Sequence, residues 1–80
     1  MRFIKLPYCW LEEDNEVYTT DLRFHPFSVD AYHASILDYM EEGVPMSQDI
    51  TKIITKSGIS YELMIEISEF EALMDKYMSQ

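Results

Sequence analysis

The chain's one cysteine and two histidines are the residues that could act as a nucleophile and a base. Cys9 stands between Tyr8 and Trp10, without the glycine-rich turn or helix start that would lower its thiol pKa. Such a cysteine is ordinarily a small, buried side chain. We therefore predict that Cys9 forms no catalytic pair with His25 or His33, and that the protein is not an enzyme.

Candidate metal ligands are also sparse. His25, Asp30 and His33 could contribute to a metal site, and the last two would share one face of a helix. No third strong ligand follows at a regular interval, and there is no Cys-x-x-Cys pair. The sequence therefore predicts no metal site and no cofactor, and a single cysteine excludes an internal disulfide.

Glu62 and Glu66 flank Met64 and would lie together on the outward face of a strand. Paired carboxylates perform acid–base catalysis where a pocket separates their pKa values, and nothing in this run predicts a pocket. We expect a solvated strand face, with Lys52 and Lys56 opposite the glutamates as cross-strand pairs.

Acidic residues are densest around a polar turn near the N-terminus. The ordinary interpretation is a solvated turn, but aromatic residues beside acids are also typical of binding surfaces. Methionine adapts to irregular surfaces, so the segment from Met40 to Met46 is a second candidate, with filler packing as the alternative. The candidate protein-binding residues are Glu12, Glu13, Asp14, Glu16, Trp10 and Met40.

The net charge is unusual for so short a chain. Fifteen acidic and six basic residues give −9, which argues against direct nucleic-acid binding. An acidic surface keeps a small protein soluble, and it also suits a protein partner with a basic surface. One such partner would be a nucleic-acid-binding host protein whose site a phage or mobile-element inhibitor blocks by charge mimicry.

The length of 80 residues predicts a single domain over residues 1–80. No apolar run reaches the ~18 residues that a membrane span needs, and the start does not resemble a signal peptide. We therefore expect a cytoplasmic location and no membrane partner. A homodimer is a further expectation, because a second copy would enlarge a small core and cover an apolar strand edge.

Period-two alternation identifies most of the strands. Residues 51–55 and 59–67 predict a hairpin closed at Gly58, where a positive φ costs little. Residues 2–6 predict a first strand, continued over 8–11 after a bulge at Pro7, which favours an edge or a strand end. Residues 17–24 predict the second strand, after a polar turn over 12–15.

The C-terminal helix is predicted to begin at Ser68, which pairs with Glu71 in a capping box. Its apolar stripe, which should pack on the sheet, consists of Phe70, Leu73, Met74, Tyr77 and Met78.

The segment from Ser28 to Glu42 fits two structures. As a helix it would have an apolar stripe with a period of 3.6 residues, Ser28 as N-cap and Gly43 just past its end. As a strand it would line one face with alternate residues from Phe27 to His33 and then become a loop. Periodicity slightly favours the helix.

Four short motifs stand out along the chain: Phe-Ile-Lys-Leu, His25-Pro26 before Val-Asp-Ala-Tyr, the Gly58 hairpin, and Glu-Phe-Glu in the final helix. In this order they resemble the small FlbD-like proteins of flagellar operons and similar proteins of gut bacteria and phages. This chain departs from the pattern in having His25 where the family has Asn, a longer segment over 36–49, and a more apolar last strand. The resemblance implies a strand over 27–34, and it offers no catalytic residues to carry over.

Together these patterns predict an α+β protein. Its expected architecture is a curved antiparallel sheet of four or five strands with a C-terminal helix packed on one face, and a second helix at about 28–42 is the alternative. The functional hypothesis is a small, acidic, non-enzymatic protein-binding or regulatory module.

Overall fold

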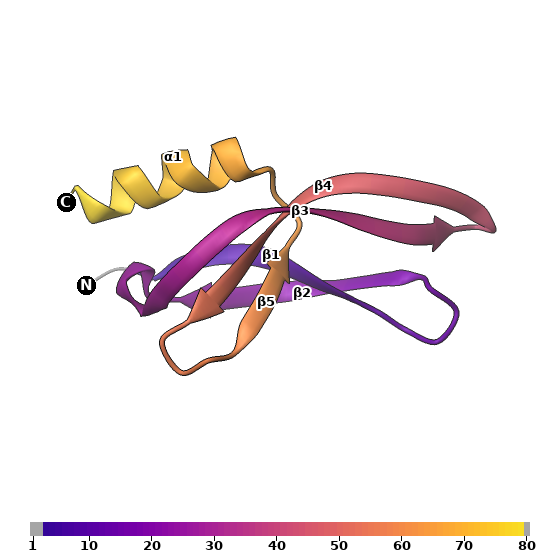
Figure 1. Cartoon of the computed structure of the whole chain (residues 1–80), viewed down its shortest axis with the longest axis horizontal. Helices are drawn as coiled ribbons and strands as arrows, with labels where there is room; N and C mark the ends of the chain where they lie inside the picture. Colours follow the sequence, from indigo (N-terminus) through magenta and orange to yellow (C-terminus); the bar gives the residue numbers. More distant parts are fainter. Residues whose placement is uncertain (1–2, 80) are drawn as a thin grey trace.

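Alternating apolar residues produce the sheet that the sequence predicts. A computed structural model describes residues 3–79, which form five antiparallel strands and one α-helix (Figure 1). The elements are β1 (Ile4–Leu11), β2 (Val17–Phe24), a 3-10 turn (Pro26–Ser28), β3 (Val29–Glu41), β4 (Val44–Thr55), β5 (Ser60–Leu63) and α1 (Ile67–Met78). The predicted α+β class, with a small sheet and one C-terminal helix, is confirmed. Arg2, the expected start of the first strand, lies outside the described residues.

The strands lie in the order β2-β1-β5-β4-β3, so the last strand is inserted between the two long hairpins. The turns of both hairpins lie on the side of the molecule away from α1 (Figure 1). The sheet curls enough for its two edge strands to meet at one point without closing. There, Glu16 and Met40 form an isolated parallel bridge, and the Met40 N–H donates to the Asn15 carbonyl at 2.8 Å.

The alternative helix over 28–42 is wrong, because this segment is β3. Its residues pair in register with β4 from Ala31↔Ile54 to Glu41↔Val44. The hairpin closes with a two-residue turn in which Glu42 and Gly43 both have positive φ, at 51° and 79°. Such a turn matches the twist of the flanking strands and allows residues 29–41 to pair with β4. Pairing with β4, and not the local period of the apolar residues, therefore makes this segment a strand.

The last strand and the helix start also differ from the prediction. β5 pairs with β4 as expected but ends at Leu63, so the expected run to Ile67 is too long. The chain then turns, and the buried Thr51 hydroxyl donates to the Ile65 carbonyl at 2.8 Å. The helix begins at Ile67 with Glu66 as its N-cap and no side-chain cap bond, so the Ser68 capping box is absent.

Pro7 causes no bulge between the two expected halves of the first strand. β1 runs unbroken in register with β2, from Ile4↔Phe24 to Leu11↔Val17. β1 is an interior strand, yet its pairing with β5 begins only at Tyr8, so Pro7 lies beside the end of β5. Its carbonyl accepts the Met64 N–H at 2.8 Å, while its missing N–H leaves no ladder partner unpaired.

Two apolar clusters hold the sheet in its curled shape. The main cluster lies under α1 and consists of Ile4, Leu6, Phe24, Ile53, Leu63 and Phe70. A smaller cluster of Cys9, Leu37 and Ile50 lies on the opposite face, where β1 approaches the β3–β4 hairpin. Among the described residues, no helix is long and apolar enough to cross a membrane.

Candidate protein-binding site

The turn between β1 and β2 presents the acidic residues that the sequence singles out. The Asn15 N–H donates to the Glu12 carbonyl at 2.9 Å, and Asn15 itself has a φ of 61°. The Glu16 N–H donates to Asp14 Oδ1 at 3.0 Å, which closes the turn with a side chain of the kind favoured there. Glu12, Glu13, Asp14 and Glu16 are all exposed. We call these four residues, together with Trp10 and Tyr18, the acidic tip.

A row of aromatic rings leads from the main core to the acidic tip. Tyr8 and Tyr61 contact the core, and their ring centroids are 5.4 Å apart. Tyr8 and Trp10 are 5.6 Å apart, and Trp10 stacks on Tyr18 across the strands at 6.2 Å. Trp10 is 38% exposed and Tyr18 43%, so the outer half of this row is open to a partner.

The carboxylates of the tip act directly on these rings. The Trp10 Nε1–H donates to Glu12 Oε1 at 2.9 Å, which fixes the indole beside the turn. The negative charge of Asp14 raises the pKa of Tyr18, with further contributions from desolvation, Glu16 and Glu12. Because negative charge disfavours a phenolate, it would favour a cation held over the same ring.

The structure brings Met40 to the acidic tip, although the two are far apart in sequence. Besides its bridge to Glu16, Met40 lines a cavity of about 490 Å³ between the two hairpin turns, together with Asn15 and Met46. All six predicted binding residues therefore gather at one end of the molecule. Met40 is half-buried, so part of its side chain packs within this end of the molecule and part is open to a partner.

Within residues 3–79, neither histidine forms a hydrogen bond with Cys9. Cys9 is 4% exposed and its thiol donates to the Glu62 carbonyl at 3.5 Å. His25 caps the 3-10 turn by accepting the Phe27 N–H at 3.2 Å, and His33 is exposed on β3. No group of three or more potential metal ligands occurs within residues 3–79.

Cys9 should resist alkylation in the folded protein. Burial, aided by the negative charge of Glu62, raises the thiol pKa from its ordinary value of 9.0 to about 11. At pH 8 the thiolate fraction, and with it the rate of iodoacetamide modification, should be about 100-fold lower than in denaturant. Mass spectrometry of timed samples measures this rate, and equal rates in both states would contradict the burial of Cys9.

The same pKa shift links Cys9 to folding. Because the unfolded thiol ionises first, folding stability should be fully present below pH 9 and fall as the pH rises towards about 11.

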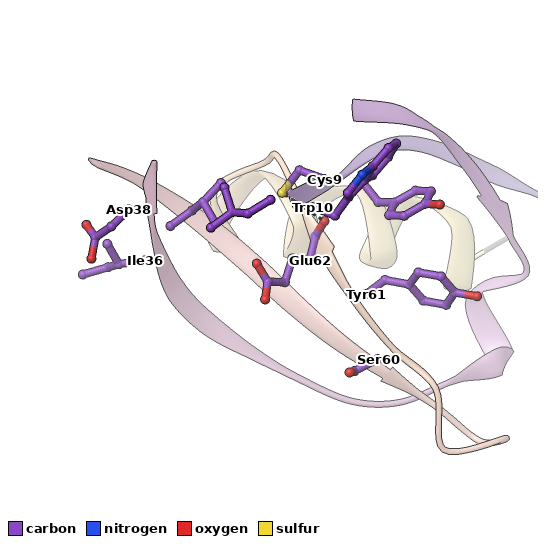
Figure 2. Close-up of a pocket in the computed structure, with 10 residues that line it drawn as sticks. Cys9, Trp10, Ile36, Asp38, Ser60, Tyr61 and Glu62 are labelled. Carbon is purple, nitrogen blue, oxygen red and sulfur yellow. Dashed lines mark hydrogen bonds between the residues drawn. The ribbon is translucent and has the colours of Figure 1, made fainter. Parts of the chain in front are cut away.

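Glu62 and Glu66 do not share a flat strand face. Glu66 is the N-cap of α1, whereas Glu62 lies on β5 opposite Lys52 and lines a groove. This groove has a volume of about 630 Å³ and lies between β1, β5 and the middle of β3 (Figure 2). No short motif predicts this groove, because its walls come from strands that only the folded sheet brings together.

Comparison with protein-family models, with curated proteins and with solved structures found no significant match. The candidate site is therefore defined by its own geometry, as an acidic and aromatic surface on a curled α+β sheet.

Proposed function

We propose that this protein is a small, non-enzymatic binding module whose acidic tip docks a basic segment of a partner protein. The observation that carries the proposal is the exposed stack of Trp10 on Tyr18. These two rings flank the β1–β2 turn, and the same turn carries the four exposed carboxylates. Aromatic faces bind cations through their π-electrons, and nearby carboxylates add hydrogen-bonded charge pairs. A lysine- or arginine-rich segment satisfies both features.

The charges of the tip are available to such a partner. In the part of the chain that the structure describes, Lys5 and Asp21 form the salt bridge, 3.9 Å apart, and no carboxylate of the tip takes part in one. The turn is also held by its own backbone bonds, so little conformational entropy would be lost on docking. A cytoplasmic location and self-association through the sheet edges belong to the same proposal.

The lone tryptophan offers a direct test, because Trp10 is the only one in the chain and lies in the tip. Titration with hexa-arginine peptide should change its fluorescence saturably. Raising the salt from about 50 to about 300 mM should weaken binding by about tenfold or more, because exposed charges are screened. Hexa-glutamine serves as the uncharged control. An unchanged spectrum, or an affinity indifferent to salt, would contradict the proposal.

A second candidate is an inhibitor that occupies the nucleic-acid site of a host protein, as a phage or mobile element would encode. The four uncompensated carboxylates of the tip favour it, because they could replace phosphate charges on such a surface. In that case a captured partner should bind DNA or RNA, and nucleic acid should displace this protein from it. A partner that binds nucleic acid and this protein at the same time would contradict the inhibitor hypothesis but not the general docking function.

A further inference from the structure

The edge strand β2 has opposite charges at its two ends. The acidic tip precedes its first residue, Val17, while Arg23 lies near its last residue and directly opposite Lys5 of β1. A strand rises about 3.3 Å per residue, so Val17 and Arg23 lie about 20 Å apart. The tip therefore cannot reach Arg23 of its own chain, but a second copy of the chain can bring the two charges together.

The basic end of β2 belongs to an exposed surface that we call the basic corner. It consists of Phe3, Lys5 and Arg23, which line a cavity of about 470 Å³. All three side chains are exposed, and the Phe3 ring lies 5.8 Å from that of His25. Lys5 forms a salt bridge with Asp21 at 3.9 Å, whereas Arg23 forms none within residues 3–79. The Arg23 guanidinium is therefore available to a carboxylate of another molecule.

The outer edge of β2 is open to a further strand. β2 is the first strand of the sheet, and within residues 3–79 only the Glu16–Met40 bridge joins its outer side to another strand. Residues 18–21 are all exposed, and three of them, Tyr18, Thr19 and Thr20, are of types that favour strands. Such an edge presents unpaired N–H and C=O groups, which a strand from another molecule can pair with.

The other edge strand, β3, is poorly suited to pair with a second copy of itself. An antiparallel pair brings the start of each strand to the end of the other. β3 has Asp30 near its start and both Asp38 and Glu41 near its end, so this pairing would place carboxylates beside carboxylates. In β2 the same arrangement places the acidic tip beside Arg23.

We propose that two copies of the chain pair antiparallel through β2, with Thr20 of one copy opposite Thr20 of the other. A two-fold axis makes the two contacts equivalent, so each acidic tip lies beside the basic corner of the second copy. The inference rests on the self-association in the proposed function, and it names the strand, the register and the charges that hold the pair.

Charge selects this register over its nearest competitor. Opposite side chains of an antiparallel pair share one face of the sheet, so the two-fold axis must pass beside a residue and not between two. An axis at Thr20 pairs residues 17–23 and places Val17 opposite Arg23. An axis at Asp21 would pair as many residues, but it would place the two Asp21 carboxylates face to face.

A cysteine at the two-fold axis tests the register. In Thr20→Cys, the Cα atoms of the two introduced residues would lie about 4.5–5.5 Å apart, within the range of a disulfide. Thr19→Cys is the matched control, because Thr19 is equally exposed but would lie diagonally from its copy, at about 7–8 Å. With oxidised glutathione, Thr20→Cys should form covalent dimers at least about tenfold faster than Thr19→Cys. Non-reducing gel electrophoresis measures the rates, and equal rates, or no dimer from either variant, would overturn the pairing.

Charge reversal tests the contact between tip and corner independently. The corner variant combines Lys5→Glu with Arg23→Glu. The tip variant combines Glu12→Lys, Glu13→Lys and Glu16→Lys, and it keeps the Asp14 side chain that closes the turn.

Each variant alone should dimerise at least about tenfold more weakly than wild type, because the contact then joins like charges. Sedimentation at about 150 mM salt is suitable, because the long-range repulsion between two acidic chains is then largely screened. An equimolar mixture of the two variants should recover the dimer, since every contact again joins opposite charges. A mixture that stays monomeric, or variants that dimerise as wild type does, would overturn the tip–corner contact.

These outcomes are separate from those of the docking function. Titration of a dilute, monomeric wild-type sample with hexa-arginine tests docking without the dimer. If the peptide binds but Thr20→Cys forms no covalent dimer, this inference fails and the docking function stands. If the dimer forms but the peptide does not bind, the docking function fails and the pairing through β2 stands.

Discussion

Neutralising the acidic tip should lower the affinity for hexa-arginine by about 100-fold. The variant combines Glu12→Gln, Glu13→Gln, Asp14→Asn and Glu16→Gln, and each amide keeps an oxygen that can accept the hydrogen bonds of the turn. Four exposed charge contacts at roughly 0.7 kcal/mol each give about 2.8 kcal/mol, which corresponds to this loss. Calorimetric titration at low salt measures the affinity directly.

A control variant removes the same amount of charge elsewhere. Asp30→Asn, Glu66→Gln, Glu69→Gln and Asp75→Asn also change the net charge by four, but these exposed residues lie on β3 and around α1. This variant should lose less than about tenfold, because only the long-range charge is reduced. Equal losses in the two variants would mean that net charge, and not the tip, attracts the peptide.

Phe70→Ala should destabilise the protein by about 3–5 kcal/mol. Phe70 is 0% exposed and is the helix residue of the main core, where its ring lies 5.0 Å from that of Tyr32. A domain of this size has a total stability of about 5–10 kcal/mol, so the variant should be close to unfolding at 37 °C. Chemical denaturation followed by circular dichroism measures the free energy of unfolding.

The matched control for this substitution is Phe27→Ala. Phe27 is 57% exposed, and its ring stacks on His25 at the surface. It should cost about 1 kcal/mol or less. If Phe70→Ala costs no more than this control, then α1 does not pack on the sheet as described.

Local patterns predicted those elements whose pairing partners are close in sequence. The strand over Val17–Phe24 is confirmed to the residue, because β-branched and aromatic residues fill it and a polar turn precedes it. The hairpin at Gly58 is confirmed because glycine there has a φ of 87°. The helix was also predicted, although its start lies one residue before Ser68 and lacks the expected cap bond.

For residues 28–42, the local pattern of apolar residues does not predict the correct secondary structure. Ile36 and Leu37 both fit a helical stripe, yet in β3 they point to opposite faces, and Ile36 is 64% exposed while Leu37 is 5% exposed. The strand is decided by its register with β4, which the period of 3.6 residues does not encode. The resemblance to FlbD-like proteins also implied a strand over 27–34, but that kinship itself stays a prediction.

The candidate site was partly predictable for the same reason. Trp10 and the four acidic residues are close together in sequence, so the sequence alone predicted that they cluster in space. The approach of Met40 to Glu16 depends on the curl of the sheet, and the place of Glu62 depends on its pairing with Cys9. Long-range pairing of this kind positions the groove, and no short motif marks it.

The most direct test of the docking function is a chemical-shift map of the ¹⁵N-labelled protein during titration with hexa-arginine. We expect the largest shifts at the Trp10 indole N–H and the backbone of residues 12–18, with a smaller response at Met40. Saturable shifts confined to this end would support a basic partner held by the acidic tip. Shifts confined to α1, or no shifts at low salt, would contradict it.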